Sequence, residues 1–208
     1  MTVTSTDPEL DGRRLRRERN RQAVVEALLS LYRGGNLRPS SAEIAEQAGL
    51  SPRSLFRYFD DVDDLCRAAV ARQEQEALPL LGVDAAPGDP LVTRVSALVG
   101  QRLRLYAAVA PAAAVARLGA PFHPALAEEL SRSRAYLRRQ LRLLFSPELR
   151  SMDHEAADAA LAAADVLCSF ESYELLRHAQ GLSPTRAGAA LRPALSALFA
   201  GDPAGARP

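Results

Sequence analysis

Hydrogen-bond donors are concentrated in the short stretch from Ser51 to Tyr58, SPRSLFRY. Arg53 and Arg57 stand four residues apart, a spacing that places two guanidinium groups on one face of a helix. Guanidinium groups and hydroxyls bind phosphate oxygens, and arginine also recognises guanine through two hydrogen bonds at the base edge. The stretch therefore has the chemistry to contact a polyanion that displays bases.

Two short helices are needed to position these donors. Ser40 and Glu43 fit the capping-box pattern S-x-x-E, which predicts the start of one helix. Gly49 supplies the left-handed conformation that ends it, and Ser51 followed by proline starts a second helix as its N-cap and first residue. Helices joined by so short a turn cross steeply, so residues 40 to 59 predict a helix-turn-helix.

The second helix, predicted over residues 52 to 58, has an apolar and a polar side. Leu55 and Phe59 stand four apart and are expected to face the core. The opposite side is short, polar and cationic. Such a face is what a helix needs in order to enter a major groove.

The stretch also follows a known sequence pattern, I-A-x-x-A-G-[VL]-S-x-x-[TS]-[LF]-[YF]-x-[YH]-F. Ile44-Ala45, Ala48 to Ser51 and Ser54 to Phe59 match it nearly position by position. Over about residues 17 to 65 the chain thus resembles the DNA-binding domain of TetR-family transcriptional regulators. The resemblance implies a homodimer that binds an operator with inverted repeats in double-stranded DNA and responds to a small-molecule effector.

The chain departs from the family at two positions. Val62 stands where the family usually carries a lysine that binds a phosphate, and Ala42 stands where some members have a basic residue that contacts a base. The remaining positions predict a DNA-contacting set. Its members are Arg17, Ser40, Ser41, Ser51, Pro52, Arg53, Ser54, Phe56, Arg57 and Tyr58.

Positive charge is concentrated near the N-terminus. The net charge of the 208-residue chain is only +1, but residues 13 to 58 contain ten arginines against four glutamates. A local excess of this kind attracts a polyanion more effectively than the total charge suggests. The arginines of residues 13 to 17 could form a cationic arm that contacts phosphate or the minor groove, or only a solvated helix start.

Composition and helical periodicity predict an all-α protein. The chain is 48% hydrophobic and 25% charged, as in a soluble globular protein, and no stretch shows strand alternation of useful length. No apolar run is long enough to span a membrane, so we expect a cytoplasmic protein. Beyond residue 60 we expect helices over about 60–78, 90–109, 111–118, 124–145, 153–180 and 184–199, separated by glycine, proline and capping residues.

This pattern predicts four segments. They are a disordered N-terminal tail over residues 1–12, a helix-turn-helix domain over 13–60, a regulatory and dimerisation domain over 61–200, and a disordered C-terminal tail over 201–208.

Other chemistry has little support in the sequence. His154-Glu155 begins like the zinc motif H-E-x-x-H, but Asp158 stands at the second ligand position. Cys66 and Cys168 form no C-x-x-C motif and are expected to be buried thiols. No phosphate-binding glycine loop or nucleophile motif is present. We therefore expect no catalytic residues, no metal and no cofactor.

A few polar residues fall on predicted apolar faces. Arg102 lies between valines and leucines of its helix, and Ser133 and Gln140 lie on the leucine stripe of the helix over 124–145. Polar groups on such faces need partners. Arg102 could pair with an internal acid such as Asp165, or its long side chain could reach water. The alternative is that Arg102, Tyr106, Ser133 and Gln140 form the polar end of a ligand pocket for a mostly hydrophobic effector.

The helix over 153–180 is apolar on two sides, which predicts that both sides are buried. A self-complementary interface would bury the second side without another kind of chain. Together with the helix over 184–199 it predicts a four-helix dimer bundle with Phe170, Tyr173, Leu191 and Leu195 in the interface.

The sequence thus favours a homodimeric transcriptional repressor that a ligand releases from DNA. An activator, a ligand-independent repressor and a protein-interaction module tethered to DNA remain alternatives, and an α-helical enzyme is a third class. The operator sequence and the effector cannot be named from the sequence.

Overall fold

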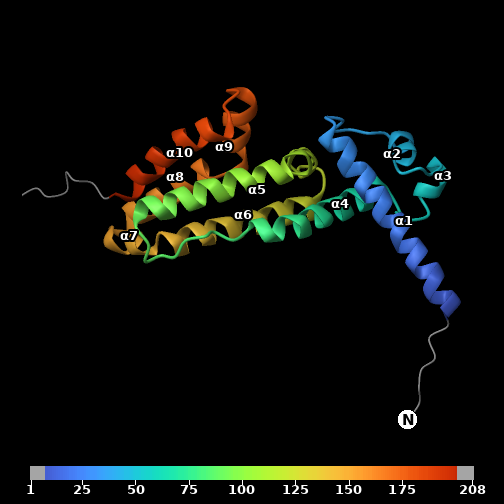
Figure 1. Ribbon diagram of the computed structural model, residues 1–208, viewed down its shortest axis with the longest axis horizontal. Coiled ribbons are helices and arrows are strands. Elements are labelled where there is room, and N and C mark those ends of the chain that lie inside the picture. The colour runs from blue at the N-terminus through green and yellow to red at the C-terminus, as the bar shows by residue number, and fades with distance from the viewer. Residues whose placement is uncertain (1–7, 201–208) are drawn as a thin grey trace, which may run out of the picture. The chain divides into compact units, whose positions relative to one another are not determined.

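The computed structural model describes residues 8–200, without the side chains of residues 8–11, Val62 and Ala125. All regular elements in that range are helical, which confirms the all-α fold (Figure 1). The predicted terminal tails lie outside the described residues over 1–7 and 201–208. The α-helices are α1 (Pro8–Arg33), α2 (Ser41–Gln47), α3 (Pro52–Leu55), α4 (Val62–Ala77), α5 (Leu91–Gly119), α6 (Pro124–Leu144), α7 (Ser146–Ser151), α8 (His154–Leu167), α9 (Phe170–Glu174) and α10 (Pro184–Phe199). A 3₁₀-helix, η1, covers Leu78–Leu80, and a π-helix, η2, covers Leu175–Ala179.

The chain forms two compact units. Unit 1 contains the residues up to Glu76 together with Val109–Ala127, and unit 2 contains Ala77–Ala108 together with the residues from Glu128 onward. Unit 1 is therefore larger than the domain predicted for residues 13–60. The physical reason is that α2 and α3, with 7 and 4 residues, cover too little of α1 to enclose a core, so α4 and the end of α5 supply further apolar side chains.

The core of unit 1 joins one apolar side of α1 to the helix-turn-helix. Val24 and Leu28 of α1 are buried against Ile44 of α2 and Leu55 of α3. Leu65 and Ala69 of α4 and Ala112 of α5 complete the cluster. The four-residue spacing that predicted an inward Leu55 and Phe59 is confirmed, since both side chains are almost fully buried.

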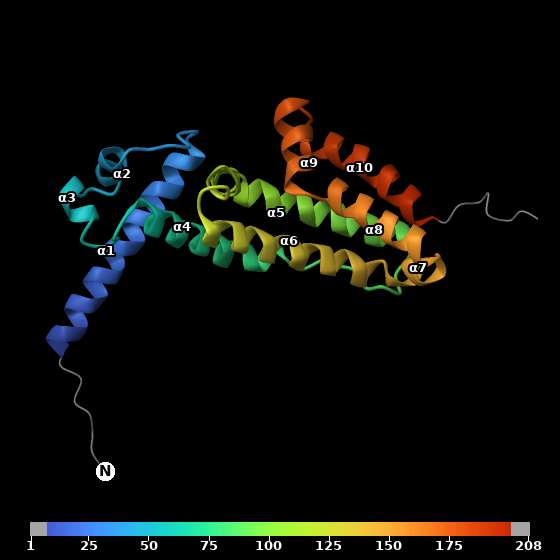
Figure 2. The ribbon, with the colours of Figure 1, turned by 180° about the vertical axis from the view of Figure 1, so that it is seen from behind.

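Unit 2 is a helical bundle. Figures 1 and 2 show α8 and α10 side by side, with the unit 2 part of α5 along them. Leu98 of α5, Leu141 of α6 and Leu195 of α10 are buried in one cluster. At one end of that cluster the rings of Phe145 and Phe199 stack with their centroids 4.1 Å apart.

Several predicted helix boundaries differ from those in the structure. Helix α1 begins at Pro8, so residues 8–12 are helical rather than disordered; proline at a helix start loses no hydrogen bond, since the first amides of a helix have no internal partner. Helix α5 continues through Pro111, where a break was expected. The alanines on both sides of that proline favour the helix, which offsets part of the cost of the missing amide hydrogen bond.

The helix predicted over residues 153–180 is divided. Ser169 has extended backbone angles and caps α9, its hydroxyl accepting a hydrogen bond from the Ser172 amide at 3.1 Å. A serine side chain can replace the helical hydrogen bond in this way, so it ends one helix and starts the next. Ser146 and Pro147 begin the short helix α7, which is not among the predicted helices.

Candidate nucleic-acid interface

Helix α2 begins with the predicted capping box. The Ser40 hydroxyl accepts from the Glu43 amide at 3.2 Å, and the Glu43 carboxylate accepts from the Ser40 amide at 2.7 Å. Hydrogen bonds from Ser40, first its side chain and then its backbone, lower the pKa of Glu43, and Asn36 adds a further one. The carboxylate is therefore ionised at neutral pH and holds the helix start in place.

The turn between α2 and α3 also has the predicted geometry. Gly49 has a φ of 68°, in the left-handed region, and the Leu50 amide donates to the Ala45 carbonyl at 2.8 Å. Ser51 then caps α3, its hydroxyl accepting from the Ser54 amide at 3.3 Å, with Pro52 as the first helical residue. The direction of α3 is thus set within about ten residues of local sequence.

Helix α3 is shorter than the predicted span of 52–58. It ends at Leu55, and the chain continues as a turn in which the amides of Arg57 and Tyr58 each donate to the carbonyl three residues earlier. This tighter winding still brings Phe59 into the core behind Leu55.

The surface of this motif is the predicted polar one. Arg53, Phe56 and Arg57 are exposed, and Phe56 keeps 50% of its surface despite being aromatic. Ser54 and Tyr58 are half-buried beside them. Of the other predicted DNA contacts, Arg17, Ser40, Ser51 and Pro52 are exposed and Ser41 is half-buried.

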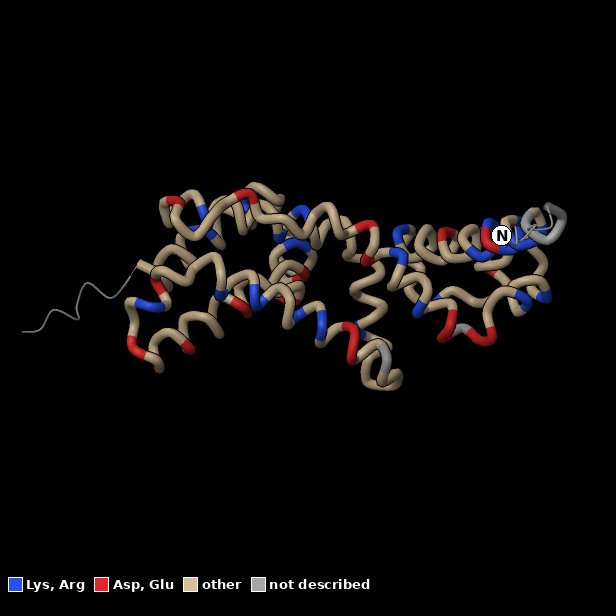
Figure 3. The backbone as a smooth tube through the Cα atoms, turned by 90° about the horizontal axis from the view of Figure 1, so that it is seen from below, with Lys and Arg blue, Asp and Glu red and all other residues tan. Residues whose placement is uncertain are grey.

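The arginines of this surface differ in their partners. No acceptor for the guanidinium groups of Arg17, Arg53 and Arg57 lies among the described residues, so all three are available to an anion. Arg21 instead lies over the Phe59 ring, 4.8 Å from its centroid. Figure 3 shows basic residues in blue and acidic ones in red along both units.

Sequence reasoning missed one residue of this region. Asn20 of α1 donates from its side-chain amide to the Tyr58 hydroxyl at 2.8 Å. The hydroxyl accepts this bond and keeps its own proton for another acceptor. Asn20 thus positions Tyr58, but the two residues are 38 apart in the sequence, and no local pattern connects them.

The predicted ligand residues in unit 2 are only partly brought together. Arg102 is 2% exposed, and its guanidinium donates to the Gln140 side chain at 3.0 Å and to the Leu137 carbonyl at 3.1 Å. It also donates to Gln101, while its Nε atom has no acceptor. Burial lowers the pKa of Arg102. Asp165, the acid suggested as its partner, pairs with Arg138 at 3.3 Å instead.

The two glutamines beside Arg102 extend this network. Gln101 and Gln140 donate to the carbonyls of Leu80 and Leu81, each at 2.6 Å, at the end of η1. The Tyr106 hydroxyl donates to the Cys168 carbonyl at 2.8 Å, and Ser133 is half-buried on α6. The chain itself therefore supplies acceptors for the two terminal nitrogens of the Arg102 guanidinium, but not for its Nε atom.

The residues predicted to form the dimer interface are inside the chain. Phe170, Tyr173, Leu191 and Leu195 are all at most 7% exposed in the single chain. Tyr106 covers part of this surface, because its ring contacts both Phe170 and Tyr173. Side chains already covered by their own chain have little surface left for a partner.

The described residues contain no group of three or more His, Cys, Asp or Glu placed to bind a metal. His154 lies 3.4 Å from the Asp158 carboxylate and is almost fully exposed. Within residues 8–200, no helix has the length and apolar character required to cross a membrane.

Comparison with known proteins gives matches in structure but not in sequence. No family model matches the chain, and no curated protein matches it. The structure is similar to that of a transcriptional regulator from Rhodococcus sp. Rha1, with a TM-score of 0.68 and 18% identity over 86% of this chain and 96% of the other. It is also similar to a proposed TetR-family transcriptional regulator from Rhodococcus sp., with a TM-score of 0.61 and 20% identity over 87% and 99% of the two chains. The chain therefore has the fold of these regulators.

Proposed function

We propose that the protein is a sequence-specific DNA-binding transcriptional regulator. The observation that carries this proposal is the exposed face of α3 and of the turn after it. Arg53 of α3 and Arg57 of the turn have no acceptor among the described residues, while Leu55 and Phe59 fix this segment from behind. The likeness in fold to structures described as transcriptional regulators supports it.

In this proposal α3 enters the major groove. Arg53, in the first turn, contacts a base edge, and the hydroxyls of Ser51 and Tyr58 contact phosphates. Arg17, on the exposed side of α1, adds a backbone or minor-groove contact. Ser40, Ser41, Pro52, Ser54, Phe56 and Arg57 complete the contacting surface.

We further propose that the regulator is a homodimer, with an interface different from the one predicted from the sequence. Exposed uncharged residues follow helical spacing on α8 and on α10. On α8 these are Ala159, Ala162 and Val166, and on α10 they are Ala189, Pro193 and Ala197. Val166 is 65% exposed, which is unusual for a valine side chain, while acidic residues occupy other positions of the same helix. A two-fold contact between such faces brings the helices close together, and it requires an operator with inverted repeats.

The regulatory role we propose is repression relieved by a small molecule. An effector needs to favour the form that does not bind DNA by only about 1 to 3 kcal/mol to release an operator. For Arg102 and Gln140 we propose a structural role instead of effector binding, because intramolecular oxygens already bind both terminal nitrogens of the guanidinium. A regulator of this kind would act in the cytoplasm.

Genome-wide footprinting followed by titration of one recovered site tests the DNA-binding proposal. Arg53→Ala should weaken binding by about 1 to 3 kcal/mol and relax base preference at one position of each half-site. Arg104→Ala, an exposed arginine of unit 2, is the control and should leave binding unchanged. Affinity that does not depend on salt would contradict the proposal, since contacts to phosphate release counterions.

Sedimentation of the purified protein tests the dimer. Val166→Glu introduces a charge into the proposed interface and should produce a monomer that binds an inverted repeat much more weakly. Glu155→Gln, at the exposed start of the same helix, should remain dimeric. A monomeric wild-type protein that binds its site in full would rule the dimer out.

A further inference from the structure

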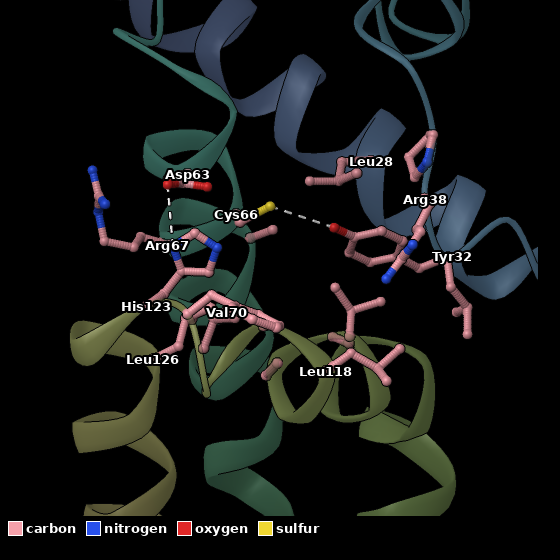
Figure 4. A pocket seen from close by; sticks show the side chains of 18 of the residues that line it. Leu28, Tyr32, Arg38, Asp63, Cys66, Arg67, Val70, Leu118, His123 and Leu126 are labelled. Carbon is pink, nitrogen blue, oxygen red and sulfur yellow. Dashed lines mark hydrogen bonds and ion pairs between the residues drawn. The ribbon is translucent and has the colours of Figure 1, made fainter.

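A cavity of about 350 Å³ lies within unit 1, away from the proposed DNA-contacting face of α3. Side chains of α1, α4 and the segment from Ala112 to Leu126 surround it (Figure 4). Its volume is within the range of small-molecule sites in proteins. None of the residues predicted as ligand contacts from the sequence lines it.

The inner wall of the cavity is apolar and neutral. Leu28, Val70, Ala116 and Leu126 contribute aliphatic surface. Figure 4 marks a polar contact between Tyr32 and Cys66, whose oxygen and sulfur lie 3.6 Å apart. Burial raises the pKa of the Tyr32 phenol and the pKa of the Cys66 thiol. Both groups are therefore uncharged near neutral pH, and a hydrocarbon body suits this wall.

The charged groups at the cavity differ in whether a group of opposite charge lies beside them. Asp63 lies 3.2 Å from the imidazole of His123, and Arg67 lies 3.6 Å from the Asp64 carboxylate. Arg38, in the loop after α1, has no acceptor for its guanidinium among the described residues. Figure 4 shows its side chain pointing toward the cavity. An anion placed there would gain a hydrogen bond to a charged donor without displacing an existing partner.

We propose that this cavity binds an amphipathic monoanion, a carboxylate with an unbranched apolar body, whose head group is held by Arg38 and whose body lies against Val70, Ala116 and Leu126. The cation at the rim selects the anionic head group, and the neutral wall excludes a second charge. The site goes beyond the proposed regulatory function and does not depend on DNA binding, so either proposal can fail without the other.

The test uses decanoate, decanol and decyltrimethylammonium, three probes that share a ten-carbon tail and differ in the charge of the head group. The chain contains no tryptophan, so Phe122→Trp, at a 77% exposed position on the cavity, supplies a single fluorescent reporter. Decanoate should shift the emission to shorter wavelength in a saturable manner. Its affinity should exceed that of decanol by roughly tenfold, the effect of one hydrogen bond to a charged group, and decyltrimethylammonium should bind more weakly still.

Variants in the reporter background locate the two ends of the ligand. Arg38→Gln should bring the ratio of decanoate to decanol affinity close to one, while Arg150→Gln, an exposed arginine of α7, should leave the ratio unchanged. Val70→Phe should weaken decanoate and decanol alike by filling the cavity. If Val70→Phe does not fold, Leu118→Phe at the 55% exposed rim serves the same purpose without altering the core.

Three results would overturn the proposal. They are an absence of saturable binding, equal affinity for decanoate and decanol in the unmodified cavity, and decanoate affinity that neither cavity-filling variant lowers.

Discussion

Arginine side chains are exposed in one region of this molecule and buried in another. Arg53 and Arg57 on the helix-turn-helix are exposed and have no acceptor among the described residues. Arg94 and Arg102 in unit 2 are at most 4% exposed, and each donates to several oxygens of the chain. The comparison teaches that an arginine on an apolar stripe does not by itself indicate a ligand. What distinguishes the two cases is whether the chain already supplies the acceptors.

The two regions also differ in the range of the interactions that build them. The capping bonds of α2 and α3 join residues three apart. In unit 2 Arg94 binds Glu148, 54 residues away, and Tyr106 binds the carbonyl of Cys168, 62 residues away. The motif can therefore form from its own sequence, whereas the polar contacts of unit 2 form only once the bundle is assembled.

The largest effect is expected for the ion pair of Arg94 and Glu148. The Arg94 guanidinium donates to both Glu148 oxygens, to the Leu144 carbonyl at 2.9 Å and to the Asp89 carbonyl at 2.8 Å. Glu148→Ala leaves this buried cation without its carboxylate and should lower the free energy of unfolding by about 3 to 5 kcal/mol. Urea denaturation measures this loss. Glu155→Ala, which removes an exposed carboxylate, should cost less than about 1 kcal/mol.

Two arginine substitutions should separate structure from recognition. Arg102→Met leaves the Gln140 oxygen and the Leu137 carbonyl without their hydrogen-bond donor. The free energy of unfolding should therefore fall by about 1 to 3 kcal/mol, with DNA affinity per folded molecule unchanged. Arg53→Ala should leave unfolding within about 0.5 kcal/mol of wild type, as for an exposed residue without partners, and should reduce DNA affinity. The melting temperature and a DNA titration of the same samples measure the stability and the DNA affinity of each variant. A melting temperature of Arg102→Met equal to that of wild type would contradict the proposed structural role of Arg102.

A smaller and local effect is expected at the start of α2. Ser40→Ala removes the N-cap and should destabilise the protein by about 1 kcal/mol. Ser41→Ala, at the first helical residue, removes no capping bond and serves as the comparison. Hydrogen exchange should show the loss mainly in amides of α2, because the capping bonds reach no further than Glu43. Equal exchange throughout the chain would show that the motif is not locally stabilised.

The smallest effect concerns acid. Hydrogen bonds and charge from Arg94 lower the pKa of Glu148 below its ordinary value of 4.5. A carboxyl group with a depressed pKa in the folded state stabilises the protein above its unfolded pKa, and this contribution is lost as the pH falls through the folded pKa. Between about pH 5 and about pH 3 the melting temperature of wild type should thus fall more steeply than that of Glu148→Gln. Parallel curves would mean that the ion pair does not alter stability.

The sequence by itself determined the helix-turn-helix and the all-α fold. Ser40 with Glu43, Gly49, and Ser51 with Pro52 fix helix starts and ends through hydrogen bonds and backbone angles within a few residues, so their pattern can be read directly. The spacing of Leu55 and Phe59 likewise set which side of α3 faces outward. For these features the local chemistry is the whole cause.

Only the tertiary structure decided which apolar and polar faces were already covered. Leu191 and Leu195 satisfy the pattern of an interface equally well whether a second chain or their own chain buries them, and here it is their own. Helical periodicity gives the side of a helix that is buried but not the element that covers it. In the same way, two acceptors of Arg102 lie 35 and 38 residues away on α6, and the cavity of unit 1 is enclosed by segments from Leu28 to Leu126. Contacts between residues so far apart depend on how the helices pack, and no local pattern encodes that packing.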